Sequence, residues 1–180
     1  MESLKLNSHS PEQTRLLGHY LGQLAEKADV YLLVGELGTG KTCLVQGIAS
    51  GLAVKEYAFS PSFVLLREYH GRLPLYHIDF YRLGCIEEIA DLGLDEYFYG
   101  RGVCVVEWAE KGLSIIPDDN LLITMHYVPA SNTGRSICLK PQGKRYHEVI
   151  EQLKKRGHWN SEDEMLNPTS IWESRAEESK

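Results

Sequence analysis

The 180-residue sequence lacks three features, each of which would indicate a class of protein. Its formal net charge is -6, so it has no excess of basic residues, which argues against a protein that binds nucleic acid unaided. Its four cysteines lie far apart without a C-x-x-C pair, which argues against a structural zinc site or a disulfide framework and favours reduced, cytoplasmic thiols. It opens without a basic and apolar leader and has no apolar run of about 20 residues, so we expect a cytoplasmic protein without a membrane segment.

The length suits one domain with a substantial core. Charge is unevenly distributed along it, because residues 157–180 contain six acidic and two basic residues and so carry -4 of the net charge of -6. Their content of Asn, Ser, Glu and Asp is typical of disorder. We therefore predict a domain at residues 1–156 and a flexible acidic tail at residues 157–180.

The sequence does contain a phosphate-loop motif. Gly35 to Thr42 read G-E-L-G-T-G-K-T and match G-x-x-x-x-G-K-S/T. The apolar run Val30 to Val34 before the motif predicts a buried strand, and the spacing after it predicts a helix. Glycines let the backbone curl until its N–H groups point at phosphate oxygens, and the helix N-terminus adds the positive end of its dipole. The residues predicted to hold a nucleotide's phosphates are Leu37, Gly38, Thr39, Gly40, Lys41 and Thr42.

Two side chains of the motif have specific predicted roles. Lys41 is expected to reach the β- and γ-phosphates, and the hydroxyl of Thr42 is expected to ligate Mg²⁺, a hard cation that takes oxygen ligands. The sequence shows no N-K-x-D motif for reading guanine. We therefore predict ATP and Mg²⁺ as the cofactors.

The remaining pattern predicts an α/β fold. A helix begins after Ser10 with Pro11 at its first position. Two strand-like runs, residues 64–69 and 73–79, are joined by only three residues, which predicts a hairpin and hence antiparallel pairing. Further strands are predicted at residues 4–6, 102–106, 121–127 and 135–139, and further helices at residues 86–92, 94–99 and 146–155. We predict a single P-loop NTPase domain of three layers with a mixed, partly antiparallel central sheet.

Four segments, in order, resemble one family. They are Gly35 to Thr42, Ser60 to Phe63 (S-P-S-F), His77 to Arg82 (H-I-D-F-Y-R) and Val106 to Trp108 (V-E-W). Over residues 10 to 140 the chain resembles the TsaE family, the YjeE-type bacterial ATPases of tRNA threonylcarbamoyladenosine formation. It departs from the family pattern at Ser62, where Thr is usual, and at Ala109, where Pro is usual. Ser62 keeps the hydroxyl.

The resemblance implies an ATP-hydrolysing subunit that works with two proteins, TsaB and TsaD, and meets tRNA only indirectly through their complex. It implies a Mg-dependent ATPase that is weak alone and more active with its partners. A P-loop kinase for a small molecule is the rival class, although the arginines that a kinase lid needs are scattered in this sequence. A nucleotide-gated binding module without turnover is a third possibility.

The resemblance also bears on two acids. Glu107 ends an apolar run, where P-loop folds place an acid near Mg²⁺ or the attacking water, and we predict that Thr42 and Glu107 hold the metal. The family treats Asp79 as its Walker B-like acid, so the inner metal ligand stays open between Asp79 and Glu107. We predict that Asp79 positions a water or the loop Ser60 to Phe63. Lys41, Asp79 and Glu107 are the predicted catalytic residues.

Three further predictions rest on the resemblance. Ser60 and Ser62 would act in a switch loop that closes when a γ-phosphate and Mg²⁺ are present. Adenine is expected between Pro11, at the start of the first helix, and Arg135. His77 is expected to orient the strand-end aspartate or to form part of a partner surface.

Overall fold

The computed structural model describes residues 3–129 and 133–156. In chain order its elements are β1 (Leu4–Ser8), α1 (Pro11–Leu24), β2 (Val30–Val34), α2 (Lys41–Gly51), β3 (Leu66–Tyr69), β4 (Leu75–Asp79), α3 (Ile86–Ala90), α4 (Asp95–Phe98), β5 (Val103–Glu107), the 3-10 helix η1 (Ala109–Lys111), β6 (Asn120–Tyr127), β7 (Arg135–Gln142) and α5 (Lys144–Arg156). The predicted strands and helices are present, with ends that differ by a few residues. Within the described residues no helix is long and apolar enough to span a membrane. The predicted tail at residues 157–180 lies outside them.

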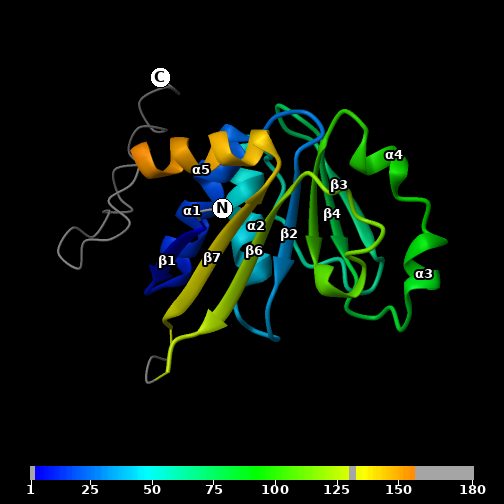
Figure 1. Ribbon diagram of the computed structural model, residues 1–180, viewed down its shortest axis with the longest axis horizontal. Helices are drawn as coiled ribbons and strands as arrows, with labels where there is room; N and C mark the ends of the chain where they lie inside the picture. The colour runs from blue at the N-terminus through cyan, green and yellow to red at the C-terminus, as the bar shows by residue number, and fades with distance from the viewer. Residues whose placement is uncertain (1–2, 130–132, 157–180) are drawn as a thin grey trace.

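Seven strands form one sheet in the order β1-β7-β6-β2-β5-β4-β3. Its four central strands, β6, β2, β5 and β4, are parallel to one another, and antiparallel pairs flank them on both sides. The predicted hairpin is the pair β3 and β4, in which Leu66 lies opposite Ile78. The mixed sheet expected from that short connection is therefore confirmed (Figure 1).

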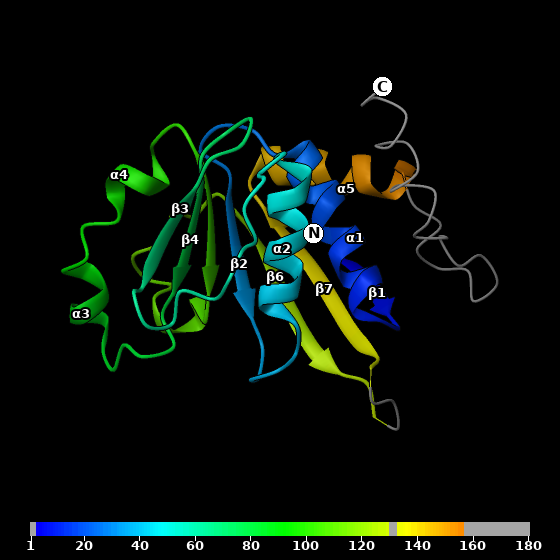
Figure 2. The ribbon, with the colours of Figure 1, turned by 180° about the vertical axis from the view of Figure 1, so that it is seen from behind.

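Helices lie on both faces of the sheet, which gives the predicted three layers. The larger core lies beneath α1, α2 and α5, and a smaller one lies beneath α3, α4 and η1, over β2, β5 and β4. Figure 1 shows β6 and β7 in front of α1 and α2, and Figure 2 shows the two helices from behind. On β2, Tyr31 and Leu33 face the larger core while Val30 and Leu32 face the smaller one. Because both faces are covered, the strand is apolar throughout.

The helices α1 and α2 touch along a stripe of glycines. A Cβ atom added at Gly47 would lie 2.1 Å from the carbonyl oxygen of Arg15 and 2.9 Å from Cα of Gly18. One turn further along, a Cβ atom at Gly51 would lie 2.1 Å from the carbonyl oxygen of His19. Only glycine lets two backbones come this close. The contact fixes α2, and with it the residues at its N-terminus, against α1.

The parallel strands bring three chain segments to one edge of the sheet, the lower edge in Figure 1. β5 lies between β2 and β4, with Leu33 opposite Glu107 and Glu107 opposite Asp79. Ligands of open α/β sheets bind outside the carboxyl ends of the strands. The loop that follows β2 therefore lies beside two acids at the place where such a fold takes its ligand.

Candidate functional site

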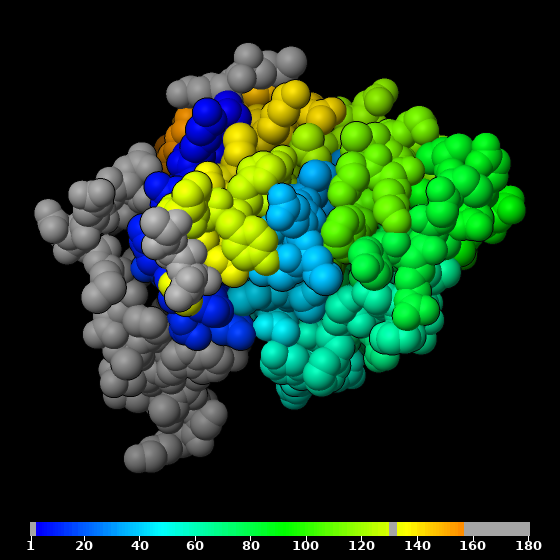
Figure 3. All heavy atoms as spheres, turned by 90° about the horizontal axis from the view of Figure 1, so that it is seen from below, coloured from blue at the N-terminus to red at the C-terminus, as the bar shows by residue number. Residues whose placement is uncertain are grey.

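The segment between β2 and α2 has the backbone conformation that the motif predicts. Gly38 and Gly40 have φ angles of 79° and 99°, in the left-handed region that favours glycine. Gly40 is the N-cap of α2, and no side-chain hydrogen bond caps that helix. The first N–H groups of α2 therefore lack a capping side chain at the positive end of the helix dipole. Seen from below, this light-blue segment lies between the yellow end of β6 and β7 and the green segments that follow β4 and β5 (Figure 3).

Lys41 folds back over the loop that precedes it. Its ammonium donates hydrogen bonds to the carbonyl oxygens of Gly35 (2.7 Å) and Glu36 (2.9 Å). It also lies 4.1 Å from the centre of the Trp108 ring. Burial lowers the pKa of Lys41, although nearby carboxylates, that of Glu107 foremost, oppose this effect. The side chain places a buried amine over the loop where the motif requires a positive charge.

Glu107 joins the end of β5 to the first turn of α2. Its Oε1 accepts a hydrogen bond from the hydroxyl of Thr42 at 2.8 Å and lies 2.9 Å from Nε2 of His77. The structure thus brings together the two residues predicted to hold the metal. The partner of His77 is Glu107 and not Asp79, the residue that it was expected to orient. His77 lies opposite Val105 on β5, and Glu107 is two residues further along that strand, on the same face. Since His77 is fully buried, it forms no part of a surface.

Asp79 holds the loop that is predicted to be a switch. Its Oδ2 accepts hydrogen bonds from the hydroxyls of Ser60 (2.9 Å) and Ser62 (2.5 Å). Its Oδ1 accepts one from the backbone N–H of Tyr81 at 2.8 Å. Both oxygens of Asp79 are therefore engaged by the loop and the backbone. The identity of the inner metal ligand stays a prediction.

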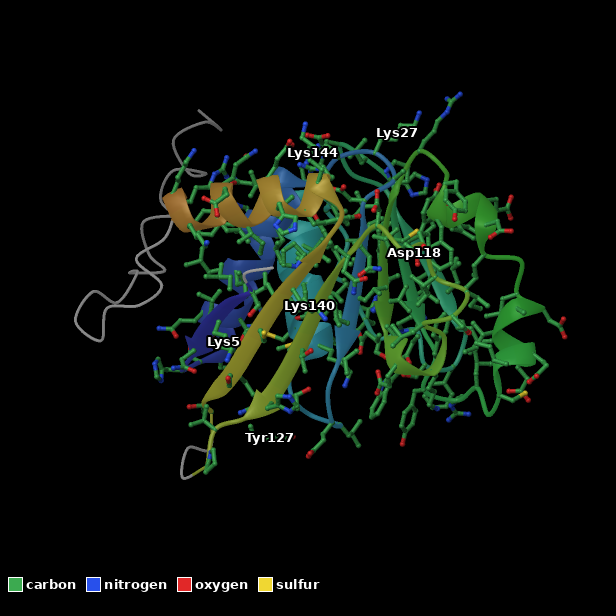
Figure 4. All side chains as sticks on the ribbon, in the orientation of Figure 1. Lys5, Lys27, Asp118, Tyr127, Lys140 and Lys144 are labelled. Atoms are coloured by element: carbon green, nitrogen blue, oxygen red, sulfur yellow. The ribbon has the colours of Figure 1, made fainter. Side chains whose placement is uncertain are left out.

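Arg135 and Tyr127, at the end of the β6 and β7 pair, hold the loop from the other side. The Arg135 guanidinium donates hydrogen bonds to the carbonyl oxygens of Thr39 (3.1 Å) and Gly38 (3.3 Å) and lies 4.5 Å from the centre of the Tyr127 ring. The Tyr127 hydroxyl donates one to the carbonyl oxygen of Leu37 at 2.6 Å. Figure 4 labels Tyr127 at this end of the sheet. These contacts fix the carbonyl groups on the outside of the loop.

Pro11 lies on the same side of α2. Its carbonyl oxygen accepts a hydrogen bond from the thiol of Cys43 at 3.2 Å, and β1, which precedes it, pairs Ser8 with Arg135. Of the two residues predicted to contact adenine, Pro11 therefore borders the first turn of α2 and Arg135 borders the loop. Their contact with adenine stays a prediction.

The donor groups of this site suit a phosphate and a hard cation. The uncapped N–H groups of α2 and the ammonium of Lys41 are hydrogen-bond donors of the kind that phosphate oxygens accept from. Thr42 and Glu107 offer oxygen atoms, and Mg²⁺ sites commonly use one or two such groups together with phosphates and waters. No cluster of three or more His, Cys, Asp and Glu side chains that could hold a metal occurs within residues 3–129 and 133–156.

Three features of the site were not predicted. The contact of Tyr127 with the loop depends on β6 lying next to β2, a neighbour relation that no sequence signal reveals. The pairing of His77 with Glu107 had no such signal either, because the spacing of two residues on one strand places His77 on the same face as Asp79 and says nothing of the neighbouring strand. The contact of Trp108 with the lysine of the loop follows from a left-handed backbone at Trp108, with φ of 57°, directly after β5.

The fold and the loop together define a P-loop protein of the α/β class with a mixed central sheet. The family model described as Threonylcarbamoyl adenosine biosynthesis protein TsaE matches residues 8–137. The chain therefore belongs to the TsaE family, as the four motifs predicted.

Two relatives and one solved structure support the assignment to this family. A Bacillus subtilis (strain 168) protein named tRNA threonylcarbamoyladenosine biosynthesis protein TsaE is 40% identical over 156 residues, which cover 86% of this chain and 96% of the relative. A protein of the same name from Treponema pallidum (strain Nichols) is 44% identical over 125 residues, which cover 69% of this chain and 93% of the relative. The crystal structure of YdiB from Bacillus subtilis matches with a TM-score of 0.74 and 36% identity, covering 86% of this chain and 95% of that one.

Proposed function

We propose that this protein binds ATP and Mg²⁺ at the site and hydrolyses ATP in support of tRNA N6-threonylcarbamoyladenosine formation. One observation carries the proposal: the N-terminus of α2, which follows Gly40 and has no capping side chain, brings Lys41 and Thr42 to the strand-end Glu107, with 2.8 Å between the Thr42 hydroxyl and the carboxylate. Phosphate binding needs N–H groups and a cation, and Mg²⁺ needs oxygen ligands. The family and the names of the relatives support the biosynthetic role.

Each side chain has a task in this proposal. Lys41 and the first N–H groups of α2 would bind the β- and γ-phosphates. Glu107 and Thr42 would hold Mg²⁺, which neutralises charge on the phosphates when bound. Asp79 accepts hydrogen bonds from the Ser60 and Ser62 hydroxyls and so would orient the switch loop. These hydrogen bonds would couple a change at the phosphates to the position of the loop.

We propose TsaB and TsaD as the partners, with tRNA reached only through their complex in the cytoplasm. The switch loop and the residues next to it support an interface at this place, since large apolar side chains are exposed there. They are Tyr57, Phe59, Phe63 and Val64, with Phe63 82% exposed. Exposed apolar side chains gathered in one segment are typical of surfaces that bind other proteins.

The direct test is phosphate release from ATP and Mg²⁺, measured with and without TsaB and TsaD. We expect slow release by the protein alone and faster release with both partners present, with a Lys41→Ala preparation as the blank for contaminating ATPases. A rate of phosphate release that is the same with and without the partners would contradict the proposed subunit role. Transfer of the phosphoryl group to a metabolite would establish the rival kinase instead.

Substitutions of Glu107 and Asp79 are expected to impair ATP hydrolysis in different ways. Glu107→Ala removes a proposed metal ligand, so the Mg²⁺ concentration for half-maximal hydrolysis should rise at least about tenfold, the loss seen when even a supporting group of a metal site is removed. Nucleotide binding without metal should be partly kept. Asp79→Ala frees the Ser60 and Ser62 hydroxyls, so kcat should fall while the Mg²⁺ requirement changes little. An equal shift of the Mg²⁺ requirement in both variants would place Asp79 among the metal ligands.

A further inference from the structure

The buried pair of His77 and Glu107 is not explained by packing. His77 is fully buried in β4, and its Nε2 lies 2.9 Å from Oε1 of Glu107. The same Oε1 accepts the hydrogen bond from the hydroxyl of Thr42. Two groups therefore converge on one carboxylate oxygen at the end of β5.

The geometry assigns the proton of the imidazole. An ionised carboxylate only accepts hydrogen bonds, so a neutral His77 must carry its hydrogen on Nε2 in order to donate to Glu107. Nδ1 is then an acceptor. This Nδ1 is buried and has no hydrogen-bond partner among the described residues.

An unpartnered buried acceptor is costly. Leaving such a group without a hydrogen bond costs about 1–3 kcal/mol. Of the neighbours of His77 on this face of the sheet, Leu75 on its own strand and Val105 on the next are apolar and buried. Asp79, two residues further along β4, is polar, but its oxygens accept hydrogen bonds from the Ser60 to Phe63 loop and from the backbone. An apolar side chain would therefore suit the position better than an imidazole, unless the Nε2–H group is needed.

We propose that His77 is a positioning residue for Glu107, and that its Nε2–H holds the carboxylate in the orientation that meets the hydroxyl of Thr42. The proposal rests on the function proposed above, because the oriented carboxylate would be a Mg²⁺ ligand. Metal ligands are commonly oriented by a hydrogen bond from a group behind them, and losing that group typically weakens metal affinity by about 10–100-fold. His77 itself touches neither metal nor nucleotide in this arrangement.

A pair of substitutions separates positioning from packing. His77→Leu removes the donor, whereas His77→Gln keeps an amide N–H at a position similar to that of Nε2. We expect His77→Leu to weaken the apparent Mg²⁺ affinity of the ATP-bound protein by about tenfold or more, and His77→Gln to recover most of that loss. ATP affinity measured without Mg²⁺ should be the same in all three proteins. Equal Mg²⁺ affinities in the wild type and His77→Leu, or equal losses in both variants, would overturn the proposal.

A second measurement uses the wild-type protein without nucleotide or metal and so does not depend on a variant that folds. The ¹⁵N chemical shifts of the His77 ring report which nitrogen carries the proton. The proposal requires the Nε2–H form, and an Nδ1–H imidazole would overturn it. If the wild type binds ATP with no dependence on Mg²⁺, the proposed function fails. If it shows that dependence but has the Nδ1–H form, the role of His77 alone fails.

Discussion

Lys41→Ala is expected to lower the affinity for ATP by about 100-fold in the presence of Mg²⁺. The ammonium would contact two phosphates, and a hydrogen bond to a charged group contributes about 1.5–3 kcal/mol, while each 1.4 kcal/mol corresponds to about tenfold in affinity. The loss should be this large because Lys41 is buried over the loop, where its charge is weakly screened by water. Titration with a fluorescent ATP analogue measures the effect.

Two controls keep this result interpretable. Lys41 also binds the carbonyl oxygens of Gly35 and Glu36, so its removal could loosen the loop itself, and the thermal unfolding temperature of the variant must be compared with that of the wild type. Lys27→Ala removes an exposed lysine at the opposite end of the sheet, as Figure 4 shows, and should leave ATP affinity unchanged. Unchanged affinity in a folded Lys41→Ala protein would reject the phosphate-binding role of the loop.

The parts of the fold that a short stretch of sequence determines could be predicted. The loop at Gly35 to Thr42 needs a strand before it and a helix after it. The short predicted connection at residues 70–72, which spans residues 70–74 in the structure, favours a hairpin. The position of β6 between β7 and β2 was not predictable, since any of the apolar strands could fill a central place in the sheet. The contact of Tyr127 with the loop depends on that position, so it could not be predicted either.

The candidate site was predictable as a set of residues but not as a set of contacts. The phosphate-loop motif predicted Thr42, and the family resemblance pointed to Glu107 and Asp79. The register then explains why the two acids meet, because Asp79 and Glu107 lie opposite each other on parallel strands. Which side chain donates a hydrogen bond to each acid depends on the rotamers that the side chains adopt, and sequence spacing carries no such information. The pairing of His77 with Glu107 and of Ser60 with Asp79 therefore required the structure.

Gly47→Ala is expected to destabilise the fold by about 2 kcal/mol or more. In the middle of an exposed helix this change would stabilise by about 1 kcal/mol, because alanine has the higher helix propensity. Here the new Cβ would lie 2.1 Å from the carbonyl oxygen of Arg15, and backbone cannot move aside as a side chain can. Overpacking of this kind typically costs about 1–3 kcal/mol and sometimes more. For a protein of this size we expect Tm to fall by about 4–8 °C, measured by calorimetry.

The same substitution at a roomy position is the matched control. A Cβ at Gly84 would meet no atom closer than the Glu88 carboxylate oxygen at 3.7 Å, so Gly84→Ala should leave Tm nearly unchanged. An unchanged Tm in Gly47→Ala would show that α1 and α2 separate at little cost. If they are held as closely as the glycine stripe indicates, moving α2 must also move Lys41 and Thr42 at its N-terminus. Gly47→Ala should then weaken ATP binding as well, although Gly47 lies more than a turn along the helix from either residue.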